Sequence, residues 1–311
     1  MANTTVHARE TACTFGTDCQ LTGVFTEASG EHHEQACALF LTAGLLHHIG
    51  PTRLHVELAR SLAAQGVAGL RFDLSGAGDS EPSSLGGDYR QRPVREVTQA
   101  MDYLQAHHGK QRFVLLGLCS GADDALATAQ QDPRVVGVVL LNGYAYPAGR
   151  FRFYRILRFY MPRLFVWQKL RNGAGRLLRR LLPRQPAATA VSTSSASVDV
   201  ETLTDQERLE LLQLDNDYRH IPPQAETAAI LQSLCQADTD LLFIYTGSEH
   251  DTYTYEGQLG AMFPDLRDDP HLQERYIQEA DHTLILKEDR DKVIAWISEW
   301  FRQAMFTRHR L

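Results

Sequence analysis

A strand-like run that passes at once into a helix constrains the fold of this chain more than any other feature. Residues 112–117, RFVLLG, have the length and apolar content of a buried β-strand, and a helical stretch follows at about 120–131. Cys119 lies between them on a sharp turn, whose tight positions are taken by Gly117 and Gly121. A buried strand connected in this way is typical of a parallel sheet, in which helices form the crossovers.

The same alternation extends along most of the chain. We expect a strand pair over 10–28 around Thr17 and Asp18, and further elements in the order of the sequence. The expected buried strands are 38–43, 66–73, 135–143, 239–247 and a last one near 274–280, and the expected helices are 52–65, 91–107 and 287–303. This pattern predicts the α/β class, with a mostly parallel central sheet and helices on both of its faces.

One long segment interrupts the pattern. The chain leaves it near residue 145 and rejoins it near 225, so we expect a core formed by 1–144 and 225–311 and a helical lid or cap formed by 145–224. The first part of the insertion mixes aromatic, aliphatic and Arg residues and suits amphipathic helices interrupted at Pro162. The small polar stretch 186–198 is expected to be a flexible loop.

Composition narrows the class of protein. Of the 311 residues, 43% are hydrophobic and 22% charged, which is the balance of a soluble globular protein. No apolar run approaches the ~20 residues that span a bilayer, and the N-terminus has no hydrophobic export core. The five cysteines are odd in number and lack zinc-type spacing, so we expect reduced thiols and a cytoplasmic location.

The net charge of −7 is unevenly distributed. Eleven Arg and Lys and no acidic residue lie between Arg150 and Arg184, whereas the rest of the chain carries 20 basic and 38 acidic side chains. The basic segment has three interpretations: a lid helix with solvated arginines, a docking site for an acidic acyl carrier protein or the phosphates of coenzyme A, or contact with an anionic membrane surface. Nucleic acid is not an expected partner, because the total charge is negative and no recognition motif is present.

The turn at Cys119 is where we expect the chemistry. A thiol there is exposed at the edge of the sheet and lies at a helix N-terminus, which favours thiolate. Ser120 is the competing nucleophile, but it is not central between the two glycines. A base and an acid are expected on the loops after the last two strands, and our candidates are His282 as base and Asp251 as acid, with Glu249 as the main rival of Asp251.

A nucleophile that attacks an acyl carbonyl also needs backbone donors for the oxyanion that forms. The amides of Ser120 and Leu45 are the candidates, the second from the loop after the strand at 38–43. His47 and His48 on the same loop are candidates for lining the pocket. Together with His55 they do not predict a zinc site, because no third ligand is placed, and the chemistry requires neither a metal nor an organic cofactor.

These motifs, in this order, resemble the α/β-hydrolase superfamily outside the insertion. Residues 72–82, FDLSGAGDSEP, resemble its D-x-R-G-x-G-x-S segment, with Ser75 where Arg is frequent. Four stretches resemble a bacterial subgroup that includes hydrolases associated with exosortase and exopolysaccharide systems and some encoded near biosynthetic clusters. They are AGLLHHIGPTRLHVELARSLAAQG, GLCSGAD, TGSEHDTYTYEGQLGAMFPDL and EADHTL.

The resemblance implies a nucleophile at Cys119, an acid at Asp251, a base at His282 and oxyanion amides at Leu45 and Ser120. Two departures from the pattern of the superfamily matter for the chemistry. Ala43 replaces the His of the common His-Gly oxyanion motif, and cysteine replaces serine, as it does in dienelactone hydrolases and some thioesterases.

The expected function is hydrolysis of an ester or thioester through a Cys119 acyl-enzyme. One alternative is an acyltransferase or cyclising enzyme that uses the same Cys-His-Asp triad on a carrier-bound or coenzyme A substrate. The other is a non-catalytic binding module on a hydrolase scaffold.

Overall fold

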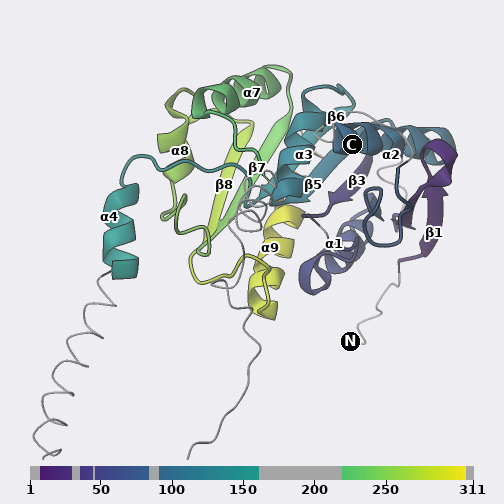
Figure 1. Cartoon of the computed structure of the whole chain (residues 1–311), viewed down its shortest axis with the longest axis horizontal. Helices are drawn as coiled ribbons and strands as arrows, with labels where there is room; N and C mark the ends of the chain where they lie inside the picture. Colours follow the sequence, from purple (N-terminus) through teal and green to yellow (C-terminus); the bar gives the residue numbers. More distant parts are fainter. Residues whose placement is uncertain (1–7, 30–35, 45, 84–90, 161–218, 306–311) are drawn as a thin grey trace, which may run out of the picture. The chain divides into compact units, whose positions relative to one another are not determined.

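The computed structural model describes residues 8–29, 36–44, 46–83, 91–160 and 219–305. Two compact units divide the chain. The first comprises Met1–Phe151 and Pro222–Leu311, and the second comprises Arg152–Ile221. The first unit contains the sheet and the helices packed on it (Figure 1).

A sheet of eight strands, in the order β1-β2-β4-β3-β5-β6-β7-β8, forms the centre of the first unit. Strands β3 to β8 run parallel, and the hairpin β1-β2 joins one edge antiparallel to β4. The strands are β1 Glu10–Phe15, β2 Leu21–Thr26, β3 Ala36–Leu41, β4 Ala68–Phe72, β5 Arg112–Leu118, β6 Val135–Leu141, β7 Asp240–Thr246 and β8 Leu272–Ile277. The predicted α/β class, with a mostly parallel sheet, is confirmed.

Helices cover both faces of the sheet, because neighbouring strand residues point to opposite sides. In β3, Cys37 and Leu39 belong to one apolar cluster, whereas Ala38 and Phe40 belong to another. The first cluster is covered by α2 Arg92–His108, α3 Ser120–Ala129 and α7 Gln224–Gln236, and the second by α1 Leu54–Ala63 and α9 Lys287–Trp300. A short helix, α8 Gln258–Met262, precedes β8.

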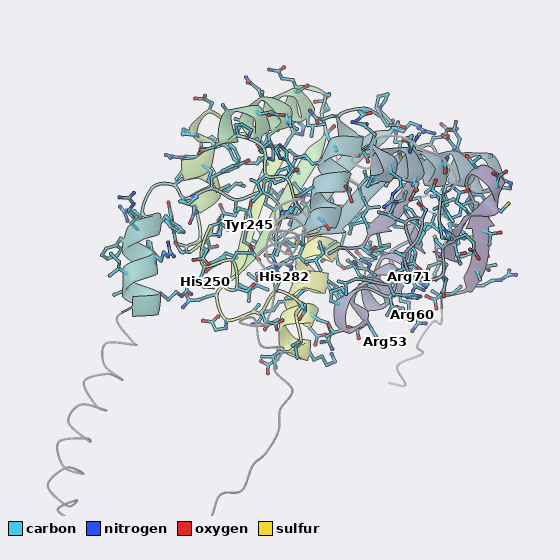
Figure 2. All side chains as sticks on the ribbon, viewed as in Figure 1. Arg53, Arg60, Arg71, Tyr245, His250 and His282 are labelled. Carbon is cyan, nitrogen blue, oxygen red and sulfur yellow. The ribbon has the colours of Figure 1, made fainter. Side chains whose placement is uncertain are left out.

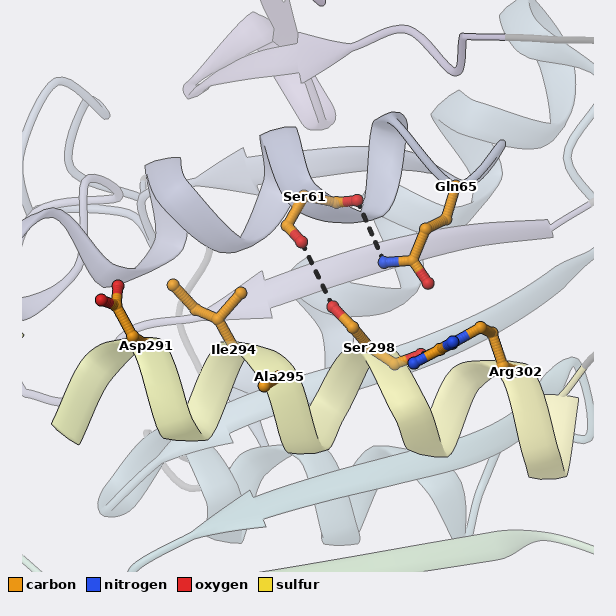
Figure 3. A pocket seen from close by; sticks show the side chains of 7 residues that line it. All are labelled: Ser61, Gln65, Asp291, Ile294, Ala295, Ser298 and Arg302. Atoms are coloured by element: carbon orange, nitrogen blue, oxygen red, sulfur yellow. Dashed lines mark hydrogen bonds between the residues drawn. The ribbon is translucent and has the colours of Figure 1, made fainter. Parts of the chain in front are cut away.

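The helices α1 and α9 pack side by side on their face of the sheet (Figure 3). The hydroxyls of Ser61 and Ser298 join them at 3.2 Å, and Gln65 donates to the carbonyl of Ser61 at 3.1 Å. The surface pocket between the two helices is lined by these side chains and by Asp291, Ile294, Ala295 and Arg302. None of the candidate catalytic residues lines this pocket.

The predicted lid falls mostly outside the described residues. Of the predicted range 145–224, residues 145–160 and 219–224 are described. They include α4 Phe151–Arg155 and the π-helical turn Ile156–Tyr160 that follows it. The side chains of Phe153, Ile156 and Leu157 are exposed there. The stretch around Pro162 and the loop predicted over 186–198 are not described, so the lid stays a prediction.

No helix within the described part of the chain is long and apolar enough to cross a bilayer.

The parallel arrangement brings the carboxyl ends of β3 to β8 to one edge of the sheet. Ligands and reacting groups of open α/β sheets bind outside this edge. The loops that leave it carry the candidate residues of the sequence analysis.

Candidate active site

Cys119 occupies a strained turn between β5 and α3. Its φ of 53° and ψ of −117° lie in a region that residues with a side chain rarely adopt. A Cβ on Gly117 would lie 2.1 Å from the carbonyl oxygen of Gly121, and one on Gly121 would lie 2.6 Å from that of Leu41. Only glycine therefore allows the helix to approach the strand so closely, which is the physical reason for both glycines.

The thiol of Cys119 lies at the start of α3, half buried beside an apolar cluster. The backbone of the turn is fixed on both sides. The Cys119 amide donates to Leu141 in β6 at 2.8 Å, and its carbonyl accepts from Ala122 at 3.0 Å. The strained residue is held by the sheet on one side and by the helix on the other.

His282 lies on the loop after β8 and faces the turn. Its Nδ1 is 2.7 Å from Oε1 of Glu249. The hydrogen bond to Cys119, and to a lesser extent the one to Glu249, outweigh the effect of burial and raise the pKa of His282 to about 10. Since Nδ1 is bound to the carboxylate, Nε2 is the ring nitrogen left for the thiol. Figure 2 shows His282 near the centre of the first unit, with His250 and Tyr245 from the neighbouring β7 region.

The carboxylate bound to His282 is that of Glu249, whereas the sequence predicts Asp251. A turn placed directly after β7 decides this, because the amide of Glu249 bonds the carbonyl of Thr246 at 3.2 Å and its own carbonyl accepts from Thr252 and Tyr253. Asp251 comes two residues later with an exposed side chain, 3.7 Å from Nε2 of His250. The prediction of Asp251 as the partner of His282 is wrong, and the rival Glu249 takes the position.

Asn142 is a site residue that the sequence analysis missed. It follows β6 with a φ of 51° and a fully buried side chain, whose Nδ2 is 3.3 Å from Nδ1 of His282. Its Oδ1 accepts from the amide of Thr246 at 2.9 Å, which fixes the orientation of the carboxamide. The hydroxyl of Thr246 bonds Ser248 at 2.7 Å, so this network supports the loop that carries Glu249. An Asn-Gly pair at the end of a buried strand was the available signal.

The turn at Cys119 between β5 and α3 is called the elbow below, and Ser120 joins it to the loop after β3. The Ser120 hydroxyl accepts from the amide of Gly44 at 2.9 Å, and Ser120 is the first residue of α3. The main-chain N–H groups of a first helical turn have no partner within the helix and are oriented toward its N-terminal end. Leu45, the second predicted oxyanion donor, lies outside the described residues, although its neighbour Gly44 is held at the elbow.

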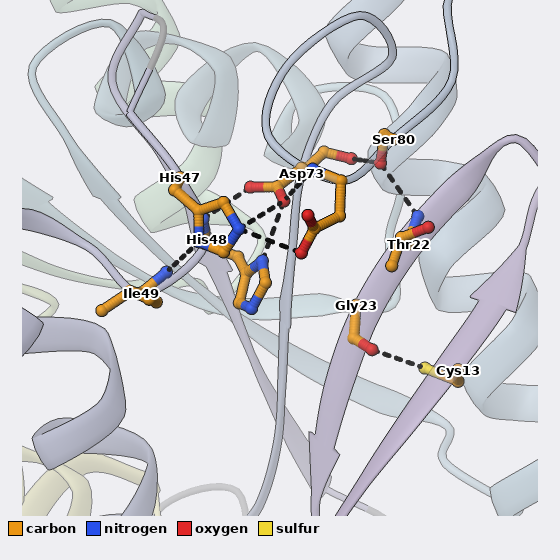
Figure 4. Close-up of polar contacts among 9 residues, drawn as sticks. Cys13, Thr22, Gly23, His47, His48, Ile49, Asp73 and Ser80 are labelled. Carbon is orange, nitrogen blue, oxygen red and sulfur yellow. Dashed lines mark hydrogen bonds and ion pairs between the residues drawn. The ribbon is translucent and has the colours of Figure 1, made fainter.

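The two adjacent histidines of this loop bind acidic residues from the loop after β4 (Figure 4). Nδ1 of His48 is 2.8 Å from Oδ2 of Asp73, and Nε2 of His47 is 3.0 Å from Oδ2 of Asp79. Burial disfavours the charged form of Asp73, but hydrogen bonds from His48 and the Asp79 amide outweigh it and hold the pKa of Asp73 below its usual value. The pocket-lining role of His47 and His48 stays a prediction.

The segment that resembles D-x-R-G-x-G-x-S has a structural explanation. Asp73 is fully buried, and a Cβ on Gly78 would lie 2.2 Å from its Oδ2. The hydroxyl of Ser80 donates to the carbonyl of Asp73 and accepts from the amide of Thr22. Ser75, where Arg is frequent, binds Glu96 of α2 through its amide and its hydroxyl. The motif thus shapes the loop after β4.

Comparison with family models places the chain in a known family. Residues 33–250 match the family described as serine aminopeptidase, S33. This range is well over half of the chain, and it includes Cys119 and Glu249 but ends before His282. The chain belongs to this family. It is therefore a hydrolase of the α/β-hydrolase superfamily.

Solved structures share the fold of this hydrolase at low sequence identity. An esterase of Pyrococcus furiosus, Pf2001, is 11% identical with a TM-score of 0.57, and the match covers 96% of this chain and 91% of that one. A putative hydrolase from Agrobacterium vitis is 17% identical, with a TM-score of 0.51 and coverage of 94% and 98%. The mouse alpha/beta hydrolase domain-containing protein 10 is 14% identical, with a TM-score of 0.51 and coverage of 94% and 99%. A search of curated proteins found no match.

Proposed function

We propose that this hydrolase cleaves an ester or thioester through an acyl-enzyme on Cys119. The single observation that carries the proposal is the hydrogen-bonded series from Glu249 through His282 to Cys119 at a nucleophile elbow. An acid that orients a base, and a base that bonds a nucleophile, are the arrangement that nucleophilic catalysis needs. The triad proposed here is Cys119-His282-Glu249.

In the first step, the Cys119 proton is held on Nε2 of His282 while the sulfur attacks the acyl carbonyl. The new C–S bond gives a tetrahedral oxyanion. Nε2 then protonates the leaving alkoxide or thiolate as its bond to the acyl carbon breaks. In the second half, Nε2 takes a proton from water, the hydroxide attacks the acyl-enzyme, and the C–S bond breaks to release the acid. Glu249 stabilises the imidazolium in both halves.

The proposed oxyanion donors are the amides of Ser120 and Leu45. The Ser120 amide faces the N-terminal end of α3, where developing negative charge is stabilised by unpaired N–H groups. The hydrogen bond from Gly44 to the Ser120 hydroxyl supports the assignment of Leu45, because it joins that loop to the elbow. It also gives the Ser120 side chain a role other than that of nucleophile.

The cysteine favours thioesters over amides as substrates. Exchange between a substrate thioester and a Cys acyl-enzyme converts one thioester into another, whereas an amide must expel a poor leaving group. The family is described as serine aminopeptidases, so the residue at the elbow is the reason for proposing a different substrate class. We assign the chain to the subgroup of exosortase-associated and biosynthetic-cluster-associated hydrolases on the motifs given above. We also propose a cytoplasmic location, on the odd number and the spacing of the five cysteines in the sequence.

A second candidate is acyl transfer from a carrier-bound or coenzyme A substrate. The observation that favours it is the start of the basic segment, where the side chains of Arg150 and Arg152 are exposed beside exposed Phe153. Cationic side chains around an apolar contact suit an acidic carrier domain or the phosphates of coenzyme A. Product analysis separates the candidates, because hydrolysis releases the free acid and transfer places the acyl group on an alcohol, amine or thiol.

The decisive experiment is intact-mass spectrometry after incubation with a panel of acyl thioesters and esters. We expect a mass increase equal to one acyl group, mapped to Cys119 by peptide analysis and absent in Cys119→Ala. Iodoacetamide should label Cys119 faster than the other four cysteines. Undiminished turnover by Cys119→Ala would overturn the proposal. Slow labelling of Cys119 together with no turnover would instead support a non-catalytic binding module.

A further inference from the structure

We propose that His47, His48, Asp73 and Asp79 form a binding site for a divalent transition-metal ion of the zinc type. The four side chains come from two loops, one after β3 and one after β4, and belong to no step of the proposed reaction. Figure 4 labels His47, His48 and Asp73 of this group. One ligand atom from each residue lies within 4.8 Å of all the others.

The distances between these atoms fit a tetrahedral site. Zinc binds imidazole nitrogen and carboxylate oxygen at about 2.0–2.2 Å, so neighbouring ligand atoms around it are separated by about 3.3 Å. Oδ2 of Asp73 is 2.8 Å from Nδ1 of His48 and 3.6 Å from Nε2 of His47, and Nε2 of His47 is 3.0 Å from Oδ2 of Asp79. The other pairs of ligand atoms lie within 4.8 Å of each other, so a metal ion would have to draw them closer by at most about 1.5 Å.

The chemistry of the donor set also fits. Two imidazoles and two carboxylates suit zinc and its neighbours in the first transition row, and they are a poor set for magnesium, which prefers oxygen ligands and keeps its waters. Two carboxylates balance the charge of one divalent cation, so a filled site is electrically neutral. In the metal-bound site, Nδ1 of His48 would carry no proton and would bind the metal in place of its hydrogen bond to Asp73, and the neutral ring would keep its proton on Nε2.

Burial makes one half of the cluster rigid and leaves the other accessible. The side chain of Asp73 has no exposed surface and that of His48 is only 8% exposed, whereas the side chains of His47 and Asp79 are 35% and 61% exposed. Backbone amides fix the buried carboxylate, since His48 donates to its Oδ1 at 2.5 Å and Asp79 to its Oδ2 at 3.0 Å. An ion can thus reach a preformed carboxylate from the surface, and the two exposed side chains can then complete its coordination.

A metal at this place would join the loop after β3 to the loop after β4. Gly44, on the first of these loops, is bonded to the Ser120 hydroxyl at the elbow. If the proposed function holds, occupancy would stabilise the geometry of the oxyanion loop. This consequence rests on the proposed function, whereas the binding of metal does not.

The test is a zinc titration of the full chain carrying Cys119→Ala, which removes the active-site thiol as a competing ligand and abolishes turnover. Calorimetry and competition with a chromogenic zinc chelator give stoichiometry and affinity. The ligand variants are His47→Ala and Asp79→Asn, whose exposed side chains can change without exposing the core. The matched controls are His107→Ala and Asp102→Asn, an exposed His and Asp on α2.

We expect one zinc ion to bind with micromolar or tighter affinity, and to raise the melting temperature. Affinity should fall on the order of tenfold or more in each ligand variant and stay unchanged in both controls, and magnesium should not compete. Failure of the Cys119→Ala protein to bind zinc would overturn the proposal. Undiminished binding by both His47→Ala and Asp79→Asn would do so as well. Because the readout is binding by an inactive protein, neither result bears on the proposed function.

Discussion

The imidazole of His282 holds its proton because it has a partner on each side. Hydrogen bonds to Cys119 and Glu249 raise its pKa to about 10, against the opposing effect of burial. A folded-state pKa above the unfolded value of about 6.5 means that the contribution to stability is fully present below pH 6.5. That contribution is lost as the pH rises through about 10, where the imidazolium gives up its proton.

The first prediction concerns the acid of the triad. Glu249→Gln keeps the size of the side chain but removes the charge that stabilises imidazolium, so kcat/KM should fall on the order of 10²-fold or more. Asp251→Asn is the matched control, two residues along the same loop, and should stay within about threefold of the wild type. Steady-state assays with one acyl thioester compare them. The reverse order of effects would restore Asp251 as the acid.

The second prediction is a pH dependence that follows from the same contact. Acylation needs imidazolium to protonate the leaving group, so kcat/KM should decline as the pH rises through about 10. Glu249→Gln replaces the charged acceptor of the His282 hydrogen bond by a neutral one and so weakens a contact that raises the pKa of His282. The decline should therefore move to lower pH in the residual activity. A pH profile of both proteins checks this. An unmoved decline would mean that another group causes it.

At the scale of elements, the elbow depends on how closely α3 approaches β3 and β5. Gly121 has an ordinary helical backbone, but an added Cβ would lie 2.6 Å from the carbonyl oxygen of Leu41. Gly121→Ala should therefore lower the free energy of unfolding by about 2–3 kcal/mol through displacement of the helix. Gly109→Ala, at the left-handed C-cap of α2 where nothing lies within 4 Å, should cost only about 1 kcal/mol. Urea denaturation measures both.

The elements themselves were predictable because their signals are local. The strand β5 is a nearly continuous apolar run, and α3 begins directly after Cys119, which has a glycine two residues away on each side. The partner of His282 was not predictable in the same way. Which carboxylate reaches the ring depends on a turn closed by the carbonyl of Thr246. The hydrogen bonds of that turn set the directions of Glu249 and Asp251, and the local sequence does not reveal them. The role of Asn142 was likewise not predictable, because it depends on β7 lying between β6 and β8 in the sheet.

The charge of the chain is divided unevenly between one basic segment and an acidic remainder. The eleven basic residues between Arg150 and Arg184 stand in a chain of net charge −7. Arg150→Glu combined with Arg152→Glu reverses the first exposed charges of that segment without touching the triad. If an acidic acyl carrier is the substrate donor, this variant should lose about tenfold in kcat/KM with acyl carrier protein substrates, and the wild type should lose a similar factor at high salt. Turnover of a small acyl thioester without a carrier should be unchanged in both cases, because this substrate has no acidic carrier for the basic segment to attract.

Arg95→Glu, which reverses an exposed Arg of α2, is the control for net charge alone and should leave both activities intact. Equal losses with the carrier-bound and the small substrate would place the effect in folding or in the active site, and the basic segment would then have no part in recognising a carrier.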